Sequence, residues 1–203
     1  MPAGDLCTQS DVISYLGDQN LGAAALSVVS FLITQVSAWA QGYCERRFDG
    51  IQTLSWTADG LGGDTLPLPE QPVISVTGVT VNGTVLFPSD GSTFGYLADN
   101  RSVTIINGSF TRGRKNVQIS YTAGYPYTFT PGTPTPGPGD TLTGTPADLR
   151  WAVIETVALR YKRRTSLGQN SGNIQGQSIS YDSSIAPKDA MVIFNKYKKN
   201  TPW

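Results

Sequence analysis

The side chains that most often perform chemistry in proteins are scarce in this sequence. It contains no histidine, which excludes Ser-His and Cys-His nucleophiles and every histidine-bound metal site. Two carboxylate pairs, Asp59/Asp64 and Asp148/Glu155, are candidates for the acid and base of a small glycosidase. Because most acids in the chain lie at predicted turns or helix starts, structural roles are favoured. We therefore predict that the chain is not an enzyme.

Motifs that hold nucleotides or metals are also absent. The sequence has no Walker loop, no nucleotide-binding glycine pattern and no EF-hand loop. The glycines after the first predicted strand lead into Pro67 and another strand, so no helix N-terminus follows to hold phosphate. Cys7 and Cys44 fit no metal or redox spacing. We interpret them as free thiols in a reducing compartment, with a disulfide as the alternative, and we expect no cofactor and no metal.

Charge is balanced overall but unevenly placed. Residues 1–50 carry two basic and five acidic side chains (−3), residues 51–147 carry four and six (−2), and residues 148–203 carry nine and four (+5). This balance argues against a globally basic nucleic-acid-binding protein, and it leaves room for a locally positive surface.

Two helices are predicted near the N-terminus. Thr8-Gln9-Ser10-Asp11 resembles a capping box and starts a short helix that Gly17 ends. A long helix follows from about Asn20 to Arg47. Its first part, residues 21–40, is uncharged, but separate polar and apolar stripes indicate an amphipathic helix in water rather than a membrane span. We therefore expect a soluble chain without a membrane partner.

The polar stripe of this long helix consists of small neutral side chains. It is either a weakly polar solvent face or, as we favour, a face packed against a neighbouring subunit. Its subunit-interface candidates are Ser27, Ser30, Thr34 and Ser37, and Gln41 continues the stripe. The opposite, apolar stripe comprises Leu21, Ala25, Val28, Leu32, Val36, Trp39 and Tyr43.

From Ile51 the hydrophobic period changes to two, which indicates strands. The predicted strands are Gln52–Thr57, Val73–Val81, Tyr96–Leu97, Val103–Ile106 and Val117–Tyr121. Asn82-Gly83 gives the strongest hairpin signal. Strands this short and regular predict a small antiparallel sandwich or barrel. The following Pro/Gly-rich segment, residues 126–147, is predicted to form neither strand nor helix, and to be either a passive linker or a loop that grips a partner.

A further helix is predicted from Asp148 to Arg164, with apolar side chains on two sides. It is therefore contacted on two sides, either within a monomer core or between the core and a neighbour, which adds Ala152 and Leu159 to the subunit-interface candidates. A basic cluster ends this helix. Its members are Arg160, Lys162, Arg163 and Arg164. They form a solvated helix end, salt bridges between subunits, or a surface that meets DNA phosphates.

The remaining sequence reads as a tether and a terminal docking helix. Gly168–Ser184 is a flexible tether or a β-finger ordered only on assembly, and Pro187 suits the first position of a helix. Aromatic and basic side chains beyond it are docking candidates. These are Phe194, Tyr197, Lys198, Lys199 and Trp203. We predict that this helix is disordered in the free protein and becomes ordered on its partner.

The predicted fold class is α+β, with N-terminal and C-terminal helices forming a helical core and an inserted small antiparallel β-sandwich or barrel-like region. Six segments divide the chain. They are 1–50 (N-terminal helices), 51–125 (antiparallel β region), 126–147 (Pro/Gly-rich loop), 148–167 (C-terminal core helix), 168–186 (tether) and 187–203 (docking helix and tail).

Taken in order, several segments resemble the head–tail connector (adaptor, or head-completion) proteins of tailed bacteriophages. The resemblance is carried by Tyr43-Cys44-Glu45-Arg46-Arg47-Phe48, Leu66-Pro67-Leu68-Pro69 with Pro72-Val73-Ile74-Ser75-Val76, Ile119-Ser120-Tyr121-Thr122-Ala123-Gly124-Tyr125, Pro146-Ala147-Asp148-Leu149-Arg150 with Arg160-Tyr161-Lys162-Arg163-Arg164, and Ser178-Ile179-Ser180-Tyr181. It covers most of the chain.

This resemblance implies a structural virion protein made in the host cytoplasm and located in the neck. It implies a homo-oligomeric ring, commonly a dodecamer, seated under the portal protein. The ring extends the DNA channel, lets DNA pass without sequence-specific binding, and joins a downstream stopper, tail terminator or tail tube. Docking on the portal falls to Pro187–Trp203, and the basic cluster becomes a candidate for lining the channel.

Two other classes compete with this interpretation. The first is another virion ring, a stopper or tail terminator, which would bind the tail tube and not the portal. The second is a carbohydrate-binding or adhesin module, suggested by Trp56, Tyr96 and Tyr121 in the turn-rich β region.

Overall fold

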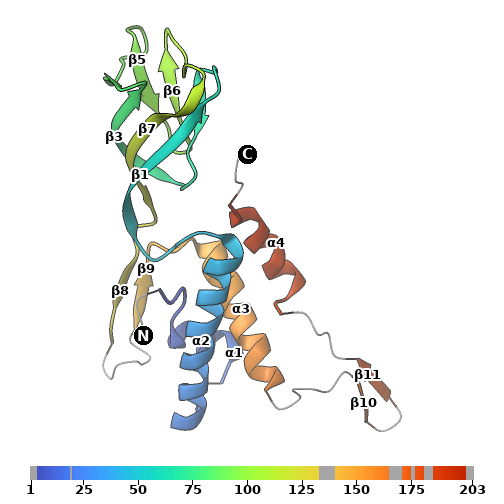
Figure 1. Ribbon diagram of the computed structural model, residues 1–203. Helices are drawn as coiled ribbons and strands as arrows, with labels where there is room; N and C mark the ends of the chain where they lie inside the picture. The colour runs from blue at the N-terminus through green and yellow to red at the C-terminus, as the bar shows by residue number, and fades with distance from the viewer. Residues whose placement is uncertain are drawn as a thin grey trace. The chain divides into compact units, whose positions relative to one another are not determined.

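The computed structural model describes residues 4–18, 20–132, 140–164 and 185–199, together with the backbone of 171–174 and 177–180. The chain divides into two compact units. The first combines the N-terminal residues up to Asp49 with Tyr127–Lys198, and the second combines Gly50–Pro126 with the residues from Lys199 onward. Helices fill the first unit and antiparallel strands fill the second (Figure 1). The predicted α+β class is confirmed.

The helices of the described residues are α1 (Gln9–Leu16), α2 (Ala23–Cys44), α3 (Ala147–Arg163) and α4 (Lys188–Tyr197). The predicted capping box of α1 is confirmed. The Asp11 N–H donates to the Thr8 hydroxyl at 3.2 Å, and the Asp11 carboxylate accepts the Thr8 N–H at 2.7 Å. Gly17 ends this helix with φ +71°, a left-handed conformation that glycine adopts without steric cost.

Helix α3 lies at the centre of the first unit and packs against α1, α2 and α4, while α2 and α4 also contact each other (Figure 1). The core between these helices is aliphatic at its centre and aromatic near α4. Its fully buried members include Val29, Ile33, Val36, Val153, Val157 and Phe194. The two-sided contact predicted for α3 is thus met within the chain.

The predicted orientation of α2 is wrong. Its buried residues are Val29, Ile33, Val36, Ser37, Ala40 and Cys44, so Val36 alone of the predicted apolar stripe is buried. The helix has no charged side chain over its whole length, and weak contrast between its faces left the orientation open. By length and composition α2 is apolar enough to cross a membrane, but its buried face packs on other helices of the unit.

The Pro/Gly-rich segment contains strands, contrary to the prediction. β8 (Thr128–Thr130) pairs antiparallel with β9 (Thr141–Thr143). The β-forming triplets Thr-Phe-Thr and Thr-Leu-Thr lie outside the stretch where prolines are dense, so their N–H groups remain free to pair. Leu142 is buried, which gives the hairpin an apolar anchor.

The tether also contains paired backbone. β10 (Ser171–Ile174) and β11 (Gln177–Ser180) form an antiparallel hairpin. This matches the β-finger alternative, whereas its ordering on assembly stays a prediction. The other residues between 168 and 184 lie outside the described part of the chain.

The second unit is built from seven strands within its described residues. They are β1 (Ile51–Gly60), β2 (Thr65–Pro67), β3 (Val73–Val81), β4 (Thr84–Leu86), β5 (Gly95–Ala98), β6 (Ser102–Ile106) and β7 (Gly113–Gly124). Five of the predicted strands correspond to β1, β3, β5, β6 and β7, and β2 was missed. The predicted hairpin is confirmed: Asn82 and Gly83, with φ of +50° and +80°, connect β3 and β4, as a two-residue turn requires.

These strands form two sheets, in the orders β1-β7-β3-β4 and β2-β6-β5. Apolar side chains from both sheets share one core, which includes Leu66, Val79, Val103 and Ile119. The predicted sandwich-like region is therefore confirmed.

The aromatic side chains that suggested a carbohydrate-binding module belong to this core. Tyr96 and Tyr121 are buried and Trp56 packs against the same cluster, so they do not form an exposed sugar platform.

Candidate assembly surfaces

Two of the four acids considered for catalysis have structural roles. Asp148 accepts hydrogen bonds from Lys196 and Tyr197, and Asp59 accepts the Lys115 backbone N–H at 2.6 Å. No group of three or more Cys, Asp or Glu residues within the described chain is placed to hold a metal ion.

Both cysteines are buried free thiols, as predicted. Burial raises the pKa of the Cys44 thiol to about 11 and also raises the pKa of Cys7. Both therefore remain protonated and poorly nucleophilic at neutral pH.

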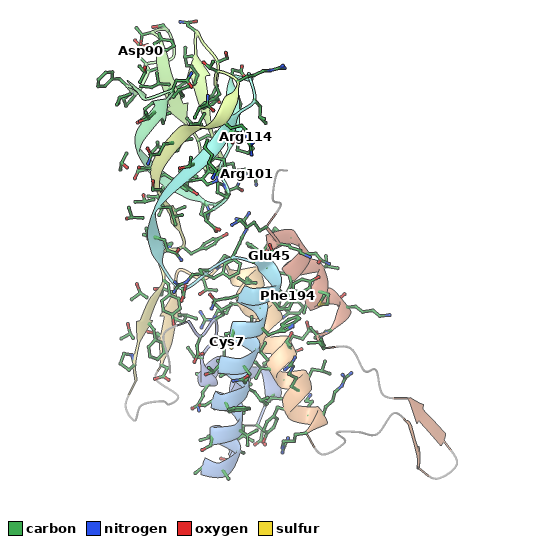
Figure 2. All side chains as sticks on the ribbon, viewed as in Figure 1. Cys7, Glu45, Asp90, Arg101, Arg114 and Phe194 are labelled. Carbon is green, nitrogen blue, oxygen red and sulfur yellow. The ribbon has the colours of Figure 1, made fainter. Side chains whose placement is uncertain are left out.

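Phe194, a predicted docking anchor, is a core residue of the first unit (Figure 2). Its ring meets Trp39 edge-on at 5.3 Å and Tyr43 at 6.5 Å between centroids. The Cys44 thiol donates to the Phe194 carbonyl at 3.5 Å. A side chain with no exposed surface cannot contact a partner, so the prediction for Phe194 is corrected: it fixes α4 to α2.

Tyr197, another predicted docking residue, also contacts side chains of its own chain. Its hydroxyl donates to Asp148 at 2.6 Å, Lys196 pairs with the same carboxylate at 2.7 Å, and its ring packs edge-on against Phe48 at 5.8 Å. Burial would raise the pKa of Asp148, but the hydrogen bonds from Lys196 and Tyr197 outweigh it, so this pKa lies below its ordinary value. Helix α4 is thus tied to the start of α3 by charge as well as by packing.

The other docking candidates differ from one another. The Lys198 ammonium lies 5.2 Å from the Tyr43 ring centroid and its side chain is exposed. Within the second unit, Lys199 pairs with Glu70 at 2.5 Å. Trp203 lies outside the described residues.

The polar stripe of α2 faces the N-terminal segment of its own chain. Ser37 is buried and accepts the Leu6 N–H at 2.9 Å, and Ser30 accepts a hydrogen bond from Gln9. Thr34 donates to Asp5 at 3.4 Å and to the Ser30 carbonyl at 3.3 Å. The subunit-interface prediction is therefore corrected for Ser30, Thr34 and Ser37, which contact their own chain.

Ser27, the remaining member, is exposed, and its hydroxyl donates to the Ala23 carbonyl at 3.0 Å. For Ser27 the interface role stays a prediction. Of the two α3 candidates, Ala152 is fully buried in the unit and is corrected in the same way, whereas Leu159 is half-buried.

A different face of α2, which the sequence pattern did not predict, is open to solvent. Its exposed positions follow a seven-residue repeat and comprise Ala24, Val28, Phe31, Gln35, Ala38 and Gly42. We call this the open face of α2. Phe31 is 63% exposed and Val28 is 39% exposed, and no charge interrupts the face. The complete absence of charged residues from a 22-residue helix was the available signal, because a solvent face normally carries Glu and Lys.

The basic cluster lies at the end of α3. The Arg160 guanidinium donates to the Ile185 carbonyl at 3.5 Å. Arg164 stacks over the Tyr161 ring at 3.7 Å and donates to the Tyr161 carbonyl at 2.6 Å. Lys162 is exposed and Arg163 is half-buried. Arg160 and Arg164 thus have partners on their own chain, and the three interpretations of the cluster stay open.

One ion pair that the sequence did not reveal joins α1 to α3. Arg150 donates twice to Asp11, from Nε at 3.0 Å and from a terminal nitrogen at 2.7 Å, and its other nitrogen reaches the Leu142 carbonyl at 2.9 Å. Asp11 is also the N3 residue of the α1 capping box, so this one carboxylate orders the helix start and fixes its position on α3.

The exposed, uncharged face of α2 is typical of a surface that contacts another protein. A sequence model of the head completion protein family matches residues 5–200. The chain therefore belongs to the head completion protein family, which confirms the predicted connector class and a structural role at the head–tail interface of the virion.

Solved structures to which this chain is similar come from gene transfer agent particles. The neck of the native particle, computed with C12 symmetry, has a chain 17% identical (TM-score 0.45), with 100% of this chain and 95% of that chain covered. The neck of the empty particle, computed with C6 symmetry, gives 16% identity and a TM-score of 0.46 with the same coverage. A chain in the native virion is 19% identical, with a TM-score of 0.45, and the match covers 100% of this chain and 91% of that chain. No curated protein matches the sequence.

Proposed function

We propose that this protein forms a ring of identical subunits, a dodecamer, between the portal and the tail, and that DNA passes through the ring. The role requires no bond to be made or broken, so function resides in assembly. Membership of the head completion family supports the location. The open face of α2 is the observation that carries the ring.

The open face of α2 has the composition of a protein–protein contact. Phe31 and Val28 supply apolar area, and the small residues Ala24, Ala38 and Gly42 let another backbone approach closely. Removing apolar surface from water is favourable by about 25 cal/mol per Å², so burial of this uncharged helix face stabilises the contact. A second copy of the chain is its proposed occupant.

A rotationally symmetric ring requires two different, complementary faces on each subunit. The first unit offers exposed apolar side chains away from α2 as well. Trp151 on α3 is 40% exposed, Ile185 is 55% exposed, and Val192 on α4 is 69% exposed. We propose that these three residues belong to the surface that receives the open face of α2 from the next subunit.

The C-terminal segment remains the proposed portal contact, in a revised form. Because α4 is anchored by Phe194 and Asp148, we propose that it docks as a preformed helix through exposed basic side chains near its C-terminal end, Lys196 and Lys198. The alternative in which α4 is released before docking would require exposing the Phe194 pocket.

The ring is tested by substituting Phe31→Glu and measuring copies per particle. Heads lacking the protein are complemented with the purified variant, and incorporation is measured by quantitative mass spectrometry. A charge on the open face of α2 should reduce incorporation at least tenfold. Leu61→Glu, at a residue of similar exposure (67%) in the second unit, is the matched control and should incorporate normally. Equal incorporation of both variants contradicts the proposed interface.

A further inference from the structure

Three cations gather where β7 begins, in the sequence Thr111-Arg112-Gly113-Arg114-Lys115-Asn116. We call this segment the cationic turn. Arg112, Arg114 and Lys115 are three of the four Lys and Arg residues between positions 51 and 147, and all three are exposed. The Arg112 side chain is oriented by a 3.3 Å hydrogen bond to the Leu61 carbonyl.

A bulge in the β1–β7 ladder brings two of these cations to the same side of the sheet. Ala58 pairs with Val117 and Gly60 pairs with Gly113, so a single β1 residue faces three residues of β7. In a regular strand, adjacent side chains point to opposite faces. Here Lys115 adopts φ +49°, and both Arg114 and Lys115 line one depression of about 440 Å³.

The floor of this depression is polar and neutral. Gln118 pairs with Thr57 on one side and with Thr80 on the other, and all three line the depression. They lie on the outer face of the sheet, because their strand neighbours Val79 and Ile119 are buried in the core. The Asn82-Gly83 turn and Asn116 complete the rim.

Hydrogen bonds hold the cationic turn in this conformation. The Asn116 side-chain carbonyl accepts the Gly60 N–H at 2.8 Å, and its amide donates to the Thr111 carbonyl at 2.8 Å and to Asn82 at 3.0 Å. A side chain at Gly60 would place Cβ 1.9 Å from the Thr111 carbonyl, so only glycine fits this close approach. The left-handed Lys115 is an outlier that such bonds sustain, and strain of this kind concentrates at functional sites.

The electrostatics favour an anion. No carboxylate lines the depression, and the nearby Asp59 is occupied by the Lys115 backbone N–H. Within the part of the chain that the structure describes, neither Arg114 nor Lys115 forms an ion pair. Guanidinium and ammonium groups beside hydroxyl and amide donors are the chemistry that recognises phosphate oxygens.

We propose that the cationic turn and its depression bind phosphodiester groups of DNA, an inference that rests on the proposed function for the presence of DNA. Arg114 (labelled in Figure 2) and Lys115 contact one phosphate region, and Arg112 extends the positive surface along the turn. A carboxylate-bearing protein is a poorer occupant. An open outer sheet face with two or three cations attracts a partner mainly by charge, and such a surface suits a repeating polyanion. So few contacts make the binding weak and salt-sensitive, which permits DNA to slide.

The test is duplex DNA binding by the full chain, followed by fluorescence anisotropy over a range of salt concentrations. Neutralising two phosphate contacts with Arg114→Gln/Lys115→Gln should reduce the slope of log K against log salt by about 1.8, at about 0.9 for each contact. The control Arg101→Gln removes the one cation between positions 51 and 147 that lies outside the cationic turn. It should reduce the slope by less than about 0.9. The charge-conserving swap Arg114→Lys/Lys115→Arg should retain most of the slope.

Two results would overturn this inference. One is a slope for Arg114→Gln/Lys115→Gln equal to that of Arg101→Gln. The other is competition by polyglutamate as effective as competition by DNA, which would assign the site to carboxylates. Copies per particle should be unchanged in the Arg114→Gln/Lys115→Gln variant. Failure of DNA binding would therefore count against this inference and leave the ring proposal standing. Equal incorporation of Phe31→Glu and Leu61→Glu would count against the ring interface and leave the DNA-binding measurement unaffected.

Discussion

Substitution of Phe194 with alanine measures whether α4 belongs to the folded core or waits for a partner. Phe194 has no exposed surface and contacts two aromatic rings. Truncating a buried phenylalanine costs about 3–5 kcal/mol, and the edge-on contacts with Trp39 and Tyr43 place this site in the upper part of that range. With a urea dependence of about 2 kcal/mol per M, a loss of 4 kcal/mol lowers the unfolding midpoint by about 2 M.

The assay is urea unfolding followed by far-ultraviolet circular dichroism, which the helices of the first unit dominate. Val192→Ala is the matched control: it lies on the same helix but is 69% exposed, so we expect a change within about 0.5 kcal/mol. If Phe194→Ala shifts the midpoint no more than Val192→Ala does, then α4 is undocked in the free protein. That result would refute the core assignment and restore a helix that orders only on its partner.

Two other predictions concern the first unit. Arg150→Gln leaves Asp11 partly buried without its cation and should lower the free energy of unfolding by about 1.5–3 kcal/mol. Arg47→Gln removes a mostly exposed cation from Asp49 and should cost less than about 1 kcal/mol in the same unfolding assay. Equal losses would contradict the structural role of the Asp11–Arg150 pair. Burial raises the pKa of Asp5 from 3.8 to about 6, so the fold favours the protonated acid: its stabilising effect is complete below pH 3.8 and is lost as pH rises through about 6. Asp5→Asn should therefore reduce the fall in the free energy of unfolding across this window, and an unchanged pH profile would argue against a buried Asp5.

Local signals in the sequence were sufficient for one helix start and one hairpin turn. The capping box at Thr8 and Asp11 and the Asn82-Gly83 hairpin were predictable because both depend on residues within a few positions of one another. Val73–Val81 was predicted with the observed bounds, since its alternation of buried and exposed side chains is regular near its C-terminal end.

Orientation and long-range contacts were not predictable in this way. The face of α2 that becomes buried depends on where the N-terminal segment and α4 pack, and an uncharged helix offers no contrast to indicate it. Ser37 and Ser30 were predicted to contact another subunit. Instead they accept hydrogen bonds from the Leu6 N–H and the Gln9 side chain. Phe194 carries the same sequence pattern whether it packs on its own chain or on a partner, so only the fold distinguishes the two.

The cationic turn shows a further limit of reasoning from strand periodicity. Period two assigns Arg114 and Lys115 to opposite faces of β7, and the ladder irregularity that unites them depends on Gly60 and Asn116. Gly60 and Asn116 lie more than 50 positions apart in the chain. A cluster of three cations in four residues was visible in the sequence, but its geometry was not.

We propose that this protein works as one of many identical copies arranged around a channel. The most direct measurement is the number of copies in each assembled particle, determined by mass spectrometry of purified virions. We predict a ring with the copy number of a dodecamer, in which Phe31 is protected from labelling relative to the free chain. A single copy per particle, or a Phe31 side chain equally accessible in both states, would contradict the proposed ring.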